Sequence, residues 1–132
     1  MKVLVDTSVW SLAFRKGGPA DHPAVEKLDA LLEGRAQLVL VGVILQEILQ
    51  AYRTRSVVRK VASRLAPFPL LALERTEYEQ AASLHRACAA RGTAATTVDC
   101  LIAAAAIRHR CQLLTADRDF ERIAEVVPLA LA

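Results

Sequence analysis

KVLVDTSVW, residues 2–10, opens the chain with a short β-branched run that ends at an aspartate and passes directly into a helical pattern. Such a run predicts a buried strand over residues 2–6, followed by a helix through SVWSLAF. The same succession returns at QLVLVG (37–42) with VILQEILQAY, and again at QLLT (112–115) with ADRDFERIA. This repeated strand-to-helix unit predicts the fold.

The remaining segments fit the same alternation. Breakers at Gly and Pro residues separate four more helices and two more strands, and the apolar spacing identifies each type. The four expected helices run from Pro23 to a Gly34 cap, over about 55–65 with a basic composition, over 76–91 with an amphipathic pattern closed by Gly92, and through TVDCLIAAAAIRH (97–109). The two expected strands are PLLAL (69–73) and VVPLAL (126–131). The order predicts an α/β fold with a mainly parallel central sheet of four to five strands, flanked by helices on both faces.

Length and composition limit the class of protein. With 132 residues, of which 54% are hydrophobic and 23% charged, the chain is expected to form one domain over residues 1–132 and not to be disordered. No run approaches the roughly 20 apolar residues of a membrane span, and MKVLVDTS lacks a signal-peptide pattern, so we expect a cytoplasmic protein. Cys88, Cys100 and Cys111 include no CxxC pair and are expected to be buried thiols.

The net charge of +3 is unevenly distributed. Five cations and no acid occupy residues 53–64, namely Arg53, Arg55, Arg59, Lys60 and Arg64. Such a cluster is either a solvated helix face or a surface that contacts phosphates.

Acidic residues stand where strands give way to helices. Asp6 ends the first strand, Asp117 directly follows QLLT, and Asp99 stands at the head of TVDCLIAAAAI. A fourth acid, Glu47, lies at the margin of the apolar face of VILQEILQAY, near the helix start. Because strand ends and helix starts gather at one edge of such a sheet, we expect these four carboxylates to converge. The four alanines after Asp99 would let its helix pack closely and hold the carboxylate rigidly.

Each acid also has a purely structural interpretation. Asp99 could form a capping box with Thr96, Asp117 could cap the DFERIA helix, Asp6 could stabilise a turn, and Glu47 could be a boundary residue. Together, however, four carboxylates within about 5 Å would repel by roughly 3 kcal/mol per pair at an effective dielectric near 20. Mg²⁺ or Mn²⁺ would offset this, because these hard ions prefer oxygen ligands. His22, His85 and His109 are too scattered to compete.

An acidic metal site beside a basic segment indicates phosphodiester chemistry on nucleic acid. No side-chain nucleophile is then needed. Thr7 and Ser8, next to Asp6, could hydrogen-bond a ligand carboxylate or a water on the metal, or could cap the first helix.

The chain resembles the PIN-domain ribonucleases, in particular the VapC-type toxins of bacterial toxin and antitoxin pairs. The resemblance covers nearly the whole chain and rests on four motifs in this order: VDTSVW, the lone Glu in QEIL, VDCLIAAAA and LLTADRDF. The resemblance implies that Asp6, Glu47, Asp99 and Asp117 form the Mg²⁺ or Mn²⁺ site. Ser8 would correspond to the hydroxyl beside the first aspartate, and Thr115 to the threonine ahead of the last acids. Asp119 would either add to the metal shell or favour its helix start.

The resemblance further implies an endoribonuclease that cuts structured RNA such as transfer or ribosomal RNA and thereby inhibits translation. It implies a homodimer silenced by a cognate VapB-like antitoxin, whose tail would lie across the apolar and basic surface near the site. Arg53, Arg55, Arg59, Lys60 and Arg64 would then contact RNA or antitoxin. The turn-rich GGPADHP departs from a minimal family member and leaves the role of that segment open.

Three other functions fit less of the pattern. A catalytically idle PIN-like module that only binds RNA or protein would keep the same acids. A receiver-type phosphoacceptor domain would need paired acids after the first strand and a late lysine, yet no lysine follows Lys60. A phosphatase with an aspartate nucleophile would need Asp-x-Asp in place of DTS. RNA cleavage that needs Mg²⁺ and is lost on Asp6→Asn would separate the enzyme from the idle module.

Overall fold

Four parallel strands form the centre of the molecule, in the spatial order β3-β2-β1-β4. This computed structural model describes all 132 residues. The strands are β1 (Lys2–Val5), β2 (Gln37–Val41), β3 (Leu70–Leu71) and β4 (Gln112–Leu114). Every residue of β1 and β2 after the first is buried, because helices cover both faces of the sheet. The predicted α/β fold with a parallel central sheet is confirmed.

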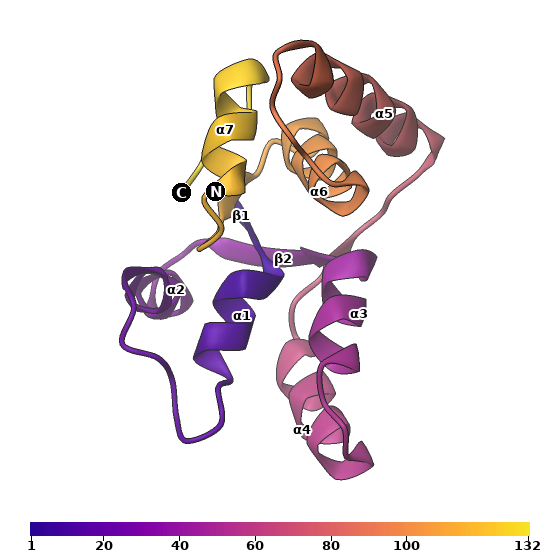
Figure 1. Cartoon of the computed structure of the whole chain (residues 1–132). Helices are drawn as coiled ribbons and strands as arrows, with labels where there is room; N and C mark the ends of the chain where they lie inside the picture. The colour runs from indigo at the N-terminus through magenta and orange to yellow at the C-terminus, as the bar shows by residue number, and fades with distance from the viewer.

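Seven helices form the outer layers. They are α1 (Thr7–Ala13), α2 (Pro23–Glu33), α3 (Gly42–Gln50), α4 (Arg55–Leu65), α5 (Arg75–Ala90), α6 (Thr97–Arg108) and α7 (Asp119–Val126). Helices α1 to α4 cover one face of the sheet, and α5 to α7 cover the other (Figure 1). None of the seven is both long and apolar enough to cross a membrane.

Helix α6 is the most deeply buried helix. Ala103, Ala104, Ala105 and Ala106 are all inaccessible or nearly so, and α6 packs against both α5 and β4. The small methyl side chains permit this close approach, as predicted from the sequence. The N-terminal end of α6 is therefore held by tight packing along the rest of the helix.

The order of the strands creates a reversal beside β1. The chain proceeds from β1 to β2 to β3 in one direction, and β4 then pairs with the opposite side of β1. In open α/β sheets, the crevice for ligands lies at the carboxyl ends of strands where the order reverses. That point falls between β1 and β4, and the Asp6 N–H extends the ladder there by donating to the Leu114 carbonyl at 2.9 Å.

The predicted last strand, VVPLAL, does not form. Helix α7 continues through Val126, and Pro128 has no N–H with which to continue a ladder. Only an isolated parallel bridge joins Leu131 to Leu113, with the Leu113 N–H donating to Ala130 and the Ala132 N–H donating back to Leu113. The sheet therefore has four strands, and PLLAL contributes just two residues to it.

Candidate functional site

Asp6 lies at the carboxyl end of β1, where the chain turns into α1. Its backbone is extended, with φ −72° and ψ 156°, and its carbonyl accepts the first N–H of the helix, from Val9, at 3.1 Å. The side chain makes no capping hydrogen bond, although it is only 5% exposed. The carboxylate is thus available for another role, and the helix-start interpretation holds for the Asp6 backbone alone.

Two hydroxyls hold one oxygen of this carboxylate. Ser8 Oγ donates to Asp6 Oδ2 at 2.7 Å, and Thr115 Oγ1 donates to the same atom at 2.9 Å. Each hydroxyl oxygen accepts a backbone N–H in turn, from Ala116 and Asp117 respectively, at 3.0 Å. These N–H groups orient both hydroxyl protons toward Asp6, so its Oδ2 is fixed while Oδ1 has no hydrogen-bond partner.

Asp99 lies in the first turn of α6 and is held through the backbone. Thr96 caps the helix, and its Oγ1 accepts the Asp99 N–H at 3.0 Å. Burial raises the pKa of the Asp99 carboxyl, as do the neighbouring charges of Asp117 and Asp6, while hydrogen bonding to Thr96 acts in the opposite direction. Only half of the capping box considered from the sequence is present, the Thr96 cap on the Asp99 N–H, and the Asp99 carboxylate lies near the charges of Asp117 and Asp6.

Asp117 and Asp119 complete the tightest group of acids. One carboxylate oxygen from each of Asp99, Asp117 and Asp119 can be chosen so that all three lie within 4.8 Å of one another. Asp117 Oδ1 also accepts the Asp119 N–H at 2.9 Å, which stabilises the turn into α7. Asp117 therefore supports the helix start and belongs to the acidic cluster at once.

Asp119 stands at the start of α7 and also lies within the acidic group. It is the first residue of α7, and its carboxylate pairs with Arg122 at 3.0 Å on an exposed surface. It also belongs to the acidic group with Asp99 and Asp117. Such an exposed ion pair contributes little to stability and would yield readily to a stronger cation.

Glu47 joins the site from α3. Thr7 Oγ1 donates to Glu47 Oε1 at 3.0 Å, which ties the middle of α3 to the residue that directly follows Asp6. Glu47 is partly buried and lies at the border of the site rather than in the tight group of three. The structure thus brings Asp99, Asp117 and Asp119 closest together and places Asp6 near Asp99, whereas Glu47 is linked to the site through its hydrogen bond with Thr7.

The chain supplies no cation to four of these five acids. Its three ion pairs are Arg108 with Glu77, His109 with Glu77, and Arg122 with Asp119. His22 instead caps α2 by accepting the Ala24 N–H, and all three cysteines are buried free thiols, as expected. An all-oxygen donor set with uncompensated charge fits Mg²⁺ or Mn²⁺, which prefer carboxylates, and fits Zn²⁺ poorly.

The acids were all identified from the sequence, and Ser8 and Thr115 were named there as supporting residues, but the way these two hydroxyls meet at Asp6 was not foreseen. That Ser8 and Thr115 share one oxygen of Asp6 depends on the pairing of β1 with β4, and no spacing in the chain reveals that contact. Glu77 was also missed. It is a buried acid outside the site that forms a capping box with Glu74 at the start of α5.

Comparisons with known proteins identify chains similar to this one. The profile of the PIN domain matches residues 3–126. Ribonuclease VapC11 of Mycobacterium tuberculosis and VapC ribonuclease Mb1587 of Mycobacterium bovis are each 33% identical to this chain over 135 residues, covering 98% of it and 97% of their own length.

Solved structures share the fold at lower sequence identity. VapBC2 from Rickettsia felis, bound to a promoter DNA fragment, superposes with a TM-score of 0.79 at 16% identity, covering 100% of this chain and 98% of that one. VapBC-1 from nontypeable Haemophilus influenzae gives 0.77 at 14% identity, with 100% and 97% coverage. FitAcB from Neisseria gonorrhoeae gives 0.73 at 21% identity, with 98% and 95% coverage.

Proposed function

The chain belongs to the PIN-domain family, with VapC ribonucleases among its relatives, and from this premise we propose that it is a Mg²⁺- or Mn²⁺-dependent endoribonuclease toxin. The proposal takes residues 1–132 as one PIN domain that cuts structured RNA, such as transfer or ribosomal RNA, and thereby inhibits translation in the cytoplasm. One observation carries it: carboxylates from distant parts of the chain gather at the reversal of the sheet, and among them only Asp119 has a cationic partner.

The proposed metal-holding residues are Asp6, Glu47, Asp99 and Asp117, with Asp119 in support. When bound, a divalent ion polarises the phosphoryl group and lowers the pKa of the attacking water. Ser8 and Thr115 act as positioning residues, because their hydrogen bonds to Asp6 Oδ2 fix the direction of Oδ1. Thr96 does the same for the backbone of Asp99. No nucleophilic side chain is assigned.

Rigid support of the acids is the contribution of the fold. Asp6 and Asp117 follow adjacent paired strands, and Asp99 begins a helix that is buried along its length. Carboxylates held in this way change position little when substrate arrives, so the electrostatic arrangement exists before binding. The pKa of the Asp99 carboxyl is raised first by burial of its charge and then by the nearby charges of Asp117 and Asp6.

A VapB-like antitoxin and a second copy of the chain are the proposed protein partners. The support is that structural neighbours are toxin and antitoxin complexes, VapBC2 and VapBC-1 among them. Co-expression with the product of a small adjacent reading frame should relieve growth arrest and yield a stable complex on size-exclusion chromatography. Light scattering of the isolated chain should give the mass of a dimer, and a monomer at every concentration tested would contradict the homodimer.

RNA cleavage by the purified chain tests the catalytic proposal. Total RNA should be cut in the presence of Mg²⁺ or Mn²⁺ and left intact in EDTA. Asp6→Asn and Asp99→Asn should abolish cutting, because each removes a charge from the site while keeping side-chain size. Asp29→Asn is the matched control, since Asp29 is an exposed acid on α2 without an ion pair.

The outcomes separate an enzyme from an idle binding module. Loss of cutting with retained RNA binding in the two site variants supports the enzyme. Intact RNA with every divalent ion tried, or equal cutting by wild type and Asp99→Asn, contradicts it. Sequencing of RNA ends after brief expression would then identify the RNA and the position of the cut.

A further inference from the structure

Helix α4 presents an unusual surface, because its cations have no acidic partner anywhere in the chain. Its exposed basic residues, including Arg53 just before the helix, are Arg53, Arg55, Arg59, Lys60 and Arg64. None takes part in an ion pair, since the three ion pairs of the structure involve Arg108, His109 and Arg122. Such a set of cations repels itself and therefore favours a partner of opposite charge.

The other surface helices lack this property. Helix α2 carries Glu26, Asp29 and Glu33, helix α5 carries Glu77 and Glu79, and helix α7 carries Asp119, Glu121 and Glu125. Cations on those helices are therefore interspersed with acids. The acid-free stretch from residue 53 to 64 stands apart from them, and Arg15 and Lys16 at the end of α1 add two more exposed cations.

One side of this surface is a groove with aromatic walls. An open space of about 540 Å³ lies between the end of α1, the end of α3 and α4, and Phe14, Tyr52, Arg59, Lys60 and Arg64 line it. The guanidinium of Arg64 lies over the Phe14 ring at 4.7 Å from its centroid, which holds that charge in place. Phe14 also stacks on Trp10, so the groove offers mainly its cations, which are the groups that bind the phosphate backbone of nucleic acid.

The groove lies at a defined position relative to the acidic site. Helices α1 and α3 pack side by side (Figure 1). Asp6 immediately precedes α1, whereas Phe14 and Tyr52 follow the opposite ends of α1 and α3, so the acidic site and the groove lie at opposite ends of this helix pair. Helix α1 has seven residues, which corresponds to a length of about 10 Å, a distance that a few nucleotides of RNA can span. The exposed residues of α1 and α3, namely Ser11, Gly42, Gln46 and Gln50, carry no charge that would repel phosphate.

We propose that the α4 surface binds the phosphate backbone of the substrate RNA, a few nucleotides from the bond that is cut. The inference rests on the proposed function, because it names how that site obtains its substrate. The acidic site itself repels phosphates, so most of the electrostatic affinity for RNA must arise elsewhere. The α4 surface carries five exposed cations within twelve residues and no acid, the largest such group in the chain.

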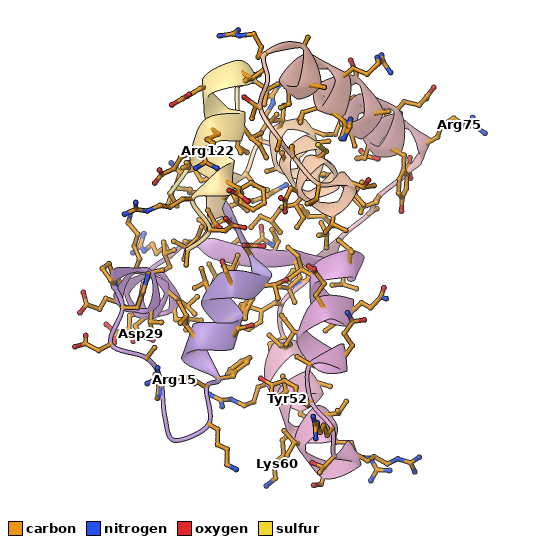
Figure 2. All side chains as sticks on the ribbon, viewed as in Figure 1. Arg15, Asp29, Tyr52, Lys60, Arg75 and Arg122 are labelled. Carbon is orange, nitrogen blue, oxygen red and sulfur yellow. The ribbon has the colours of Figure 1, made fainter.

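Figure 2 shows the separation that makes a controlled test possible. Arg15 and Lys60 extend at the lower end of the molecule, whereas Arg75 and Arg122 lie in the upper half. The test variant is Arg55→Gln with Arg59→Gln and Lys60→Gln, which removes three charges and keeps good helix formers. The matched control is Arg35→Gln with Arg75→Gln and Arg91→Gln, three exposed cations outside α4 that have no ion pair.

RNA binding is measured in EDTA on an Asp6→Asn background, so that neither metal nor cutting contributes. Loss of three phosphate contacts should weaken binding by roughly 10- to 100-fold at about 0.1 M salt and lower the salt slope by about 2. The control should change both quantities little. In Mg²⁺ with Asp6 restored, the α4 variant should raise KM and leave kcat nearly unchanged.

The possible failures are distinguishable. If the α4 variant binds RNA with wild-type affinity and salt slope, the inference is overturned even where cleavage is confirmed. Loss of binding to a partner protein alone, with RNA binding intact, overturns it as well. If the control weakens RNA binding equally, the effect is one of net charge and the inference also fails. If RNA is never cut but α4-dependent binding persists, the catalytic proposal fails and the RNA surface stands.

Discussion

Replacing Asp99 by asparagine should inactivate the protein and at the same time make the metal-free form more stable. The two effects have one cause. Asp99 lies with Asp117 and Asp119 so that an oxygen from each is within 4.8 Å of the others, and no cation of the chain balances Asp99 or Asp117. Asp99→Asn keeps the size of the side chain and the Thr96 cap on its N–H, but it removes one negative charge.

The size of the effect follows from Coulomb's law. At 4.8 Å, two unit charges repel by about 3.5 kcal/mol at an effective dielectric of 20 and by about 0.9 kcal/mol in water. Because the three acids are partly exposed, solvent screening places the relief near the lower figure, at about 1 to 2 kcal/mol. Loss of the favourable helix-dipole interaction, about 0.3 to 1 kcal/mol, offsets part of this. The net gain of about 1 kcal/mol corresponds to a melting temperature roughly 3 to 5 °C higher.

The dependence on pH has a definite sign. The pKa of Asp99 in the folded protein is raised by burial and by the charges of Asp117 and Asp6, so the folded state disfavours its ionised form. The stability penalty is therefore absent below the ordinary aspartate pKa and appears as the pH rises through the raised value. Asp99→Asn should accordingly melt above the wild type at neutral pH, and the difference should shrink in acid.

Thermal unfolding in EDTA, followed by circular dichroism across this pH range, measures the effect. Added Mg²⁺ should reverse the order, because it stabilises the wild type through binding and stabilises the variant less. Asp29→Asn, an exposed acid without an ion pair, should stay within about 0.5 kcal/mol of wild type. A variant less stable than wild type at neutral pH without metal would refute the reasoning, as would a gain that persists unchanged in acid.

Three further outcomes are expected. Thr115→Val should lower kcat/KM by roughly 10-fold through loss of its hydrogen bond to Asp6, and Thr115→Ser should restore most of it, measured on a defined RNA. The hydrogen bond from the Glu74 N–H lowers the pKa of Glu77, so the ionised Glu77 side chain stabilises the fold and this stabilisation should be lost as the pH falls through the lowered pKa. In urea unfolding, Glu77→Gln should have a lower free energy of unfolding than wild type at neutral pH, and the difference should vanish in acid. Burial, together with the nearby Cys88 and Asp99, raises the pKa of the Cys100 thiol to about 11. A thiol reagent at neutral pH should therefore modify Cys100 only after denaturant is added. Rapid labelling of Cys100 in the native protein would contradict its burial.

Much of the fold could be predicted because its signals are local. The alternation of apolar runs with helical periodicity identified every helix and the first four strands, and the basic helix over 55–65 coincides with α4. The final strand was wrong for a reason that is not local. The apolar character of VVPLAL suits a strand, but α7 extends through Val126 and Pro128 cannot donate, so only a bridge to Leu113 forms.

The sequence by itself determined which residues could do chemistry and at which ends of strands and helices they stand. Asp6, Asp99 and Asp117 were recognisable as a set, because each stands at a strand end or a helix start and these ends gather at one edge of a parallel sheet. Only the tertiary structure decided that the Ser8 and Thr115 hydroxyls donate hydrogen bonds to the same oxygen of Asp6. It also decided that Asp119 lies with Asp99 and Asp117 in one tight group. Those relations arise where β4 returns beside β1, more than a hundred residues later, and no local pattern records which strands will pair.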